Sequence, residues 1–230
     1  RLVPRGGIPP RTLLSLQKPP GRLDVAGPGR VVIDQRSPVQ NLAEWSLAGR
    51  RTTGANDAAS RWLTRGASVD RQPVFSPDGT RLAFNSDRGG NLDIWELELS
   101  TGAVRRLTVA AGDDWDPAYT RDGQHVLWSS NRSGSFEVWI AENDGGRARR
   151  VTDDGVDAEN PTATLDGAWI VYVSANPAKS GVWKIRPDGT EAQLVVAGTL
   201  AVPELSPDGL WFSYIDTGNN LLRVVALSDG

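Results

Sequence analysis

The chain has 230 residues, a formal net charge of −3 at pH 7, and neither cysteine nor methionine. A chain this long buries enough surface on folding to need no disulfide or metal for stability. No apolar run approaches the roughly 18–20 residues of a membrane span, and the charges alternate in sign instead of forming a basic patch. We therefore expect neither membrane insertion of this segment nor a nucleic-acid partner.

The N-terminal residues have two interpretations. Residues 2–6, Leu-Val-Pro-Arg-Gly, match a thrombin cleavage sequence left from an expression tag, but residues 1–5 also fit a strand that precedes a turn at Gly6-Gly7. Residues 10–17 follow, and their pattern is typical of an outer β-strand. The sequence leaves open whether residues 2–6 are a tag remnant.

From residue 23 the chain is built from repeats of about 44 residues. The prolines at 73, 117, 161 and 203 are 44, 44 and 42 residues apart, and the Asp-Gly pairs that follow keep these steps. Trp95, Trp139 and Trp183 are also 44 residues apart, with Val225 at the next position. A fixed step of this size indicates tandem supersecondary units. We predict one domain over 1–230, with repeats at approximately 23–66, 67–110, 111–154, 155–198 and 199–230.

The first repeat is divergent. Residues 23–29 stand where later copies carry their Pro-to-Gly segment, and Trp45 lies 50 residues before Trp95. The extra length falls in residues 51–59, which are rich in Thr, Gly, Asn and Ala. We interpret residues 51–59 as a loop insertion.

The second repeat indicates how each copy folds. Residues 73–76 suit a short strand, and residues 77–79, Pro-Asp-Gly, suit a tight turn because Pro presets φ and Gly accepts positive φ. Residues 81–85 alternate between apolar and polar, which is typical of a strand. Two further strands are predicted over residues 93–99 and 104–108. Four antiparallel strands without a helix form one blade of a β-propeller, and its apolar faces are buried by neighbouring blades.

The segment Phe-Ser-Pro-Asp-Gly-Thr-Arg-Leu-Ala-Phe at 75–84, followed by Ile94-Trp95 and Arg106-Leu107-Thr108, resembles the Pro-Asp-Gly class of WD-like propeller repeats, the TolB type. The resemblance covers residues 23–230. Similar propellers form C-terminal regions of some bacterial membrane-anchored serine/threonine kinases, whose repeats are most similar here, and the substrate-gating domain of prolyl oligopeptidase relatives. The resemblance implies an all-β propeller of four-stranded antiparallel blades in an extracytoplasmic, protein- or peptide-binding protein.

The number of blades stays open. Five repeats are readable, and the last ends before a fourth strand. Residues 10–17 would supply that strand and close a five-bladed ring without a free edge. The alternative is a fragment of a ring of six to eight blades.

The residues offer little for catalysis. The only histidine, His125, is expected on a strand surface, and no Gly-x-Ser-x-Gly elbow, phosphate-binding loop or kinase motif occurs. We therefore predict that this chain is not itself an enzyme. Its function is expected to be partner binding, as a sensor or interaction region of a larger protein such as a kinase. The alternative is the gating domain of a hydrolase whose catalytic part lies elsewhere.

The best candidates for a binding site are the segments that lead into the inner strands, because loops on a rigid scaffold concentrate recognition residues. Trp115 is either an interface anchor or folds back onto its own blade. Acidic residues there would suit Ca²⁺, but no calcium-loop spacing is present, so we predict no cofactor. The predicted rim comprises Asp70, Arg71, Asp114, Trp115, Asp116, Asp157 and Glu159.

Overall fold

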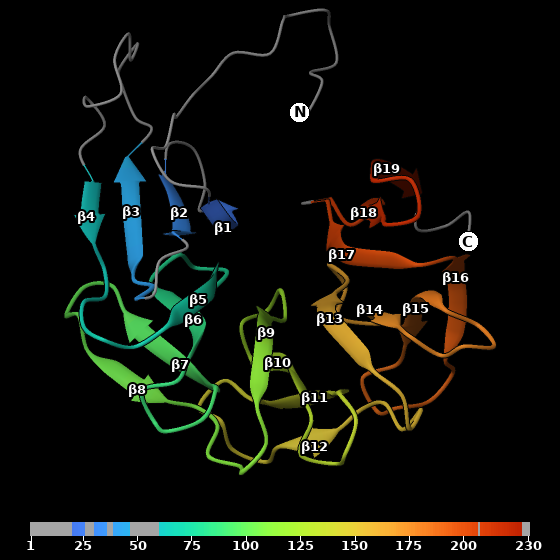
Figure 1. Cartoon of the computed structure of the whole chain (residues 1–230), viewed down its shortest axis with the longest axis horizontal. Helices are drawn as coiled ribbons and strands as arrows, with labels where there is room; N and C mark the ends of the chain where they lie inside the picture. The colour runs from blue at the N-terminus through green and yellow to red at the C-terminus, as the bar shows by residue number, and fades with distance from the viewer. Residues whose placement is uncertain (1–19, 26–29, 36–38, 47–59, 207, 227–230) are drawn as a thin grey trace, which may run out of the picture.

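The computed structural model describes residues 20–25, 30–35, 39–46, 60–206 and 208–226. The described residues form five antiparallel sheets and contain no helix that could span a membrane. Figure 1 shows the sheets following one another around a central opening, as the blades of a propeller do. The predicted all-β propeller fold is confirmed.

The strands of each sheet run in chain order from the centre outward (Figure 1). The first sheet holds β1 (Pro20–Val25), β2 (Arg30–Gln35), β3 (Leu42–Ser46) and β4 (Ser60–Trp62). The second holds β5 (Asp70–Phe75), β6 (Arg81–Ser86), β7 (Asp93–Glu98) and β8 (Val104–Arg106). The third holds β9 (Asp114–Tyr119), β10 (His125–Ser130), β11 (Glu137–Glu142) and β12 (Arg149–Arg150).

The C-terminal sheets complete the arc. The fourth sheet holds β13 (Ala158–Ala163), β14 (Ile170–Ser174), β15 (Gly181–Ile185) and β16 (Gln193–Ala197). The fifth holds β17 (Leu200–Leu205), β18 (Trp211–Asp216) and β19 (Leu221–Ala226). The inner strands β1, β5, β9, β13 and β17 contact one another in turn, so they form the wall around the axis.

The hydrophobic core lies between neighbouring sheets. The second strand of four sheets carries a fully or almost fully buried aromatic side chain at the same repeat position. These residues are Phe84, Trp128, Tyr172 and Tyr214. One cluster joins Val32 of the first sheet to Leu82 of the second, and another joins Ala83 of the second to Trp128 of the third. The large aromatics therefore hold the sheets face to face, and their burial supplies much of the stabilising energy.

The predicted start of the inner strands was wrong by three residues. β5 begins at Asp70 and not at Pro73, and β9 and β13 begin correspondingly early. Each strand continues through a β-bulge that lies between Arg71 and Val74 in β5. Most of the predicted rim residues consequently lie in strands instead of loops.

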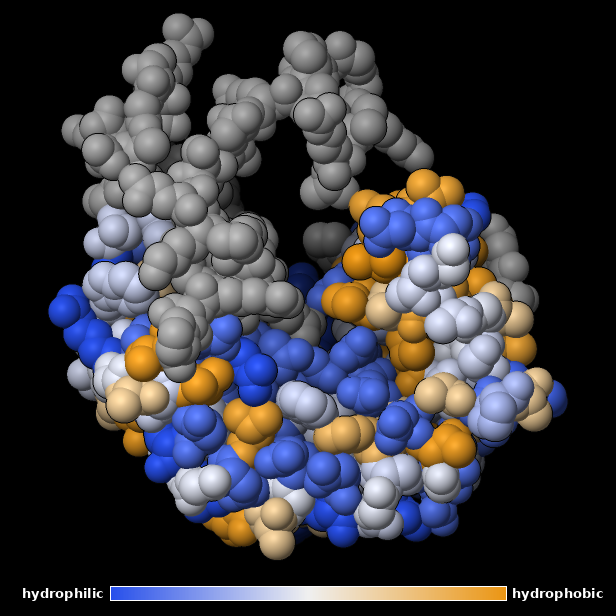
Figure 2. All heavy atoms as spheres, viewed as in Figure 1, coloured by the Kyte–Doolittle hydropathy of each residue, from blue (hydrophilic) through white to orange (hydrophobic). Residues whose placement is uncertain are grey.

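The described residues leave the ring open. In the parts of the chain that the structure describes, β1 and β17 make no extensive contact, and Figure 1 shows a gap between the first and fifth sheets. The fifth sheet exposes large apolar side chains, which gather at the C-terminal end of the arc in Figure 2. They are Leu210, Trp211, Leu221, Leu222 and Val224. Residues 2–6, 10–17 and 51–59 lie outside the described residues, so their assignments stay predictions.

Candidate functional site at the leading end of the inner strands

The first residues of the inner strands form one end of the central opening, here called the leading end. Equivalent positions of neighbouring strands carry different side chains. The first position holds Asp70, Asp114, Ala158 and Leu200, and the second holds Arg71, Trp115, Glu159 and Ala201. The third holds Gln72, Asp116, Asn160 and Val202.

The third position has a left-handed backbone in all four strands. The φ angles are 51° at Gln72, 53° at Asp116, 55° at Asn160 and 52° at Val202. Each of these residues precedes a proline and lies in the bulge of its strand. Positive φ is unfavourable for most side chains, although Asn and Asp tolerate it best. Each bulge interrupts the regular alternation of side chains in its strand, and it does so at the same position in all four strands.

Side chains at the third position tie neighbouring blades together. Gln72 and Asp116 are joined by two hydrogen bonds, one of them from the Asp116 amide to Gln72 Oε1 at 3.2 Å. Asp116 Oδ2 accepts bonds from Asn160 Nδ2 at 2.5 Å and Ser129 Oγ at 3.3 Å, and Asn160 Oδ1 accepts one from the Val202 amide at 3.2 Å. Asp116, predicted as a rim residue, is therefore a buried link between three blades.

The acids at the first position are committed to ion pairs inside their own blades. Asp70 Oδ1 lies 2.7 Å from Arg88 Nη2 and accepts a hydrogen bond from Ser86 Oγ at 2.6 Å. Asp114 accepts two bonds from Arg132 Nη2, at 2.8 and 3.0 Å. Both carboxylates are almost fully buried, at 1% and 0% exposure. Burial of this kind is tolerated only with a close partner, so Asp70 and Asp114 hold the leading end in shape.

Two donor atoms at the second position have no partner among the described residues, as is also the case for Nε1 of Trp95, Trp128 and Trp139. Arg71 Nε and Trp115 Nε1 are both buried, and neither meets a hydrogen-bond acceptor among the described residues. The Trp115 ring packs against Phe136 of its own blade, with centroids 5.0 Å apart. The predicted alternative in which Trp115 folds back onto its blade is thus the arrangement observed.

Glu159 and Asp157 bring negative charge to the same end. Asp157 is exposed and accepts a hydrogen bond from the Phe136 amide at 3.0 Å. Glu159 is partly buried, and no described residue donates a hydrogen bond to its carboxylate. Burial, together with the charges of Asp116 and Asp157, raises the pKa of Glu159 to about 7. A ligand that brings a positive charge or a donor would stabilise the ionised form.

The described residues do not assemble a metal site. No three of their His, Asp or Glu side chains converge in an arrangement that could hold a metal ion. His125 begins β10, where its amide donates to Thr120 Oγ1 at 3.0 Å beside the turn that follows β9.

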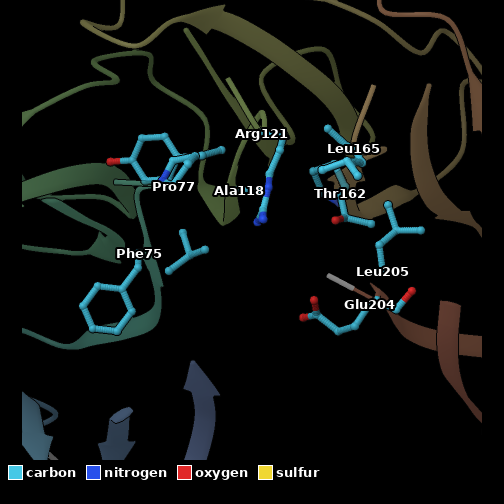
Figure 3. Close-up of a pocket in the computed structure, with 13 residues that line it drawn as sticks. Phe75, Pro77, Ala118, Arg121, Thr162, Leu165, Glu204 and Leu205 are labelled. Carbon is cyan, nitrogen blue, oxygen red and sulfur yellow. The ribbon is translucent and has the colours of Figure 1, made fainter. Parts of the chain in front are cut away.

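The opposite end of the inner strands, here called the turn end, holds a pocket that the sequence did not predict. Its volume is about 240 Å³, and side chains from β5, β9, β13 and β17 and from the turns after them line it. Figure 3 shows Arg121 reaching into this space, with Phe75 on one side and Leu205 and Glu204 on the other. The available signal was Arg121 itself, because the repeats before and after carry Pro77 and Leu165 at that position.

A comparison with protein families settles the kind of propeller. Residues 64–229 match the family described as the TolB β-propeller domain. The chain belongs to this family. The match begins in the segment after β4 and covers all four of the later TolB-type repeats.

Individual relatives agree with this assignment. A Protein TolB homolog from Chlorobium luteolum is 48% identical over 46 residues, which is 20% of this chain and 11% of that protein. The crystal structure of TolB from Acinetobacter baumannii is 24% identical, with a TM-score of 0.83 over 98% of this chain and 56% of that one. A putative TolB from Agrobacterium tumefaciens is 19% identical, with a TM-score of 0.82 over 96% and 81%. The chain thus spans about half the length of the Acinetobacter protein.

Proposed function

We propose that this TolB-type propeller is a non-catalytic scaffold that binds a protein or peptide partner at the leading end of its inner strands. The contacting residues are Arg71, Trp115, Asp157 and Glu159. The same rim includes three residues that support it without contacting the partner, because their carboxylates are already paired with neighbouring residues. They are Asp70, Asp114 and Asp116.

The observation that carries the proposal is the row of unsatisfied groups at the second position. Arg71, Trp115 and Glu159 occupy equivalent places in three adjacent inner strands, where they offer a cation, an aromatic ring and an acid. Arg71 Nε and Trp115 Nε1 have no acceptor among the described residues. A buried donor without a partner costs about 1–3 kcal/mol. An extended peptide recovers that free energy if the side chains of Arg71 and Trp115 turn outward on binding and their donors meet its acceptors.

The proposal extends to the protein from which this propeller comes. We propose an extracytoplasmic location and a role as the sensor or interaction region of a larger protein, such as a membrane-anchored kinase. Both rest on the family resemblance, and the fraction of the Acinetobacter TolB that the chain spans supports the larger size. The alternative is a propeller that gates access to a hydrolase domain. The residues that flank this segment in its parent gene distinguish a kinase with a membrane span from an α/β-hydrolase.

Site-specific photo-crosslinking in cells tests the binding surface and captures the partner in the same step. p-Benzoylphenylalanine is placed at Arg71, Trp115 or Asp157, and at Trp62 as the control. Trp62 is 45% exposed and lies in β4, the outer strand of the first sheet, whereas the leading end is formed by the inner strands. We expect the three rim positions to yield a common covalent adduct whose mass is absent at position 62.

The affinity of the captured partner provides the quantitative part of this test. Trp115→Ala is expected to weaken binding at least about 30-fold, since buried aromatic anchors contribute 2 kcal/mol or more. Trp62→Ala should leave the affinity within about twofold, as scattered surface positions do. Adducts that form equally at position 62, or a partner that binds the Trp115→Ala protein normally, would contradict the proposal.

A further inference from the structure

The pocket at the turn end of the inner strands is lined by apolar and polar surface in about equal measure. Its lining includes Val74, Phe75, Ala118, Leu165 and Leu205. Leu165 is 47% exposed, although it is a large apolar residue in a tight turn. A hollow that combines apolar side chains with a few polar groups is a preferred place for a binding site.

Arg121 differs from its counterparts in other repeats in how it meets the next turn. Pro77 lies against the next turn, 3.6 Å from where a Cβ of Gly123 would stand, and Leu165 lies 2.9 Å from the same point of Gly209. At Gly167, which follows Arg121 in the ring, nothing lies within 4 Å of that point. The side chain of Arg121 therefore leaves the seam between turns open and extends into the pocket, as Figure 3 shows.

The guanidinium of Arg121 is also available to a ligand. It is exposed, and no described residue pairs with it by an ion pair, a hydrogen bond or a ring contact. Most other arginines of the second and third sheets are paired, as Arg88 is with Asp70 and Arg132 with Asp114. Glu204 also lines the pocket, and it has a partner of its own. An unpaired cation beside apolar side chains is complementary to an anionic group that adjoins an apolar one.

The size of the pocket narrows the class of ligand. Its volume of about 240 Å³ lies below the roughly 300–1,000 Å³ of sites that enclose small molecules. It suits one or two anchoring side chains of a longer segment that continues along the surface. Hydrogen bonds between a guanidinium and a carboxylate would orient such a segment.

We infer that the turn end is a second recognition site, which binds a protein segment carrying an acidic side chain next to an apolar one. Arg121 binds the carboxylate, and the apolar neighbour lies against Leu165 and Leu205. This site is at the opposite end of the inner strands from the proposed leading-end surface, so the two bind independently.

A peptide array tests the inferred specificity directly. The array carries Gly-Gly-X-Z-Gly-Gly hexapeptides with all pairs of residues at X and Z, and the labelled full chain is the probe. We expect the strongest spots to pair Asp or Glu with Leu, Ile, Val or Phe. The peptide of the strongest spot is then titrated by fluorescence anisotropy.

Variants at position 121 separate charge from shape. Arg121→Gln should raise the dissociation constant of that peptide about tenfold, because a hydrogen bond to a charged group is lost. Arg121→Pro installs the residue that Pro77 represents in the preceding repeat, so the turn should fold while binding is lost. Arg71→Gln, at the leading end, is the matched control and should change the constant less than about twofold. Equal thermal unfolding curves for the variants verify their folding.

Several outcomes would overturn the inference. They are an array without an acidic-apolar preference, including one with no bound peptide, an acidic preference that Arg121→Gln retains, and an equal loss of affinity in Arg71→Gln. The leading-end proposal is judged by its crosslinks, so it survives or fails separately.

Discussion

The third and fourth sheets share one repeat pattern but satisfy their polar groups in different ways. In the third sheet Asp114 is paired with Arg132, whose guanidinium lies 4.5 Å from the ring centroid of Trp139 and 5.6 Å from that of Trp128. In the fourth sheet the positions of the pair hold Ala158 and Asn176. Ion pairing and cation–π contact at these positions therefore brace the third sheet. The fourth sheet has no such pair there, and its closest cation–π contact lies elsewhere, between Arg186 and the Trp169 ring at 3.9 Å.

This difference between the third and fourth sheets bears on the candidate site. Acids at the start of β9 have partners, since Asp114 binds Arg132 and Asp116 binds side chains of both neighbouring blades. The acid at the start of β13, Glu159, has no hydrogen bond from a described residue, and its pKa is raised to about 7. Glu159 is thus a perturbed acid in a sheet where the internal ion pair of the repeat is missing, and perturbed ionisable groups are more frequent at functional sites.

The largest effect is expected from removing the Asp114–Arg132 ion pair that braces the third sheet. Asp114→Asn leaves Arg132, whose side chain is 19% exposed, without its counterion. Losing one partner of a buried pair costs about 3–5 kcal/mol. Because Arg132 keeps some solvent, we expect the free energy of unfolding in urea to fall by about 2–4 kcal/mol.

Asn176→Ala is the matched control, since Asn176 occupies the position of Arg132 in the fourth sheet. The substitution removes the hydrogen bond that the Ala178 amide donates to Asn176 Oδ1, 3.0 Å long. We expect this loss to lower the free energy of unfolding by less than about 1 kcal/mol. Equal losses in the two variants would mean that the ion pair does not brace the third sheet.

The second prediction concerns the unpaired acid of the fourth sheet. The folded pKa of Glu159, about 7, exceeds its ordinary value of 4.5. Between these values the folded protein binds more protons than the unfolded one, so stability falls as the pH rises from about 4.5 to about 7. Glu159→Gln abolishes this loss and should stabilise the protein at pH 8 by about 1–2 kcal/mol, since partial exposure screens the charge.

Unfolding curves at pH 5 and pH 8 check the sign of this effect. The substitution should change stability little at pH 5, where Glu159 is largely protonated in the folded protein, and clearly at pH 8. Glu191→Gln is a suitable control because its carboxylate is exposed and does not contribute to the raised pKa of Glu159. A Glu159→Gln protein that is no more stable than the parent at pH 8 would indicate that Glu159 is not held in a destabilising setting.

Much of the fold could be predicted because repetition and alternation are properties of the sequence itself. The period-two pattern placed Leu82 and Phe84 on a buried face, and both are fully buried. The bulge escaped prediction because a residue before proline is normally extended, whereas Gln72 has a φ of 51°. That error displaced the start of each inner strand.

The candidate site was harder to predict than the fold. The pairing of Asp114 with Arg132 depends on how two side chains 18 positions apart are directed, which spacing alone does not encode. Asp70, Asp114 and Asp116 therefore looked like exposed rim residues, although they are buried. Arg121 escaped notice because its interest lies in the space that it leaves beside Gly167, and space is a property of the assembled blades.

The smallest expected effect concerns backbone strain at the third position of the inner strands. There β13 carries Asn160 and β17 carries Val202, and both have positive φ, 55° and 52°. A β-branched residue is strained in that conformation, while Asn tolerates it. Val202→Asn should therefore raise the free energy of unfolding by about 1 kcal/mol. Val202→Thr keeps the branched shape and the strain while adding polarity, so urea titration of both variants separates the two causes. A gain in Val202→Thr as large as that in Val202→Asn would show that polarity at this 40% exposed position, and not backbone strain, distinguishes β17 from β13.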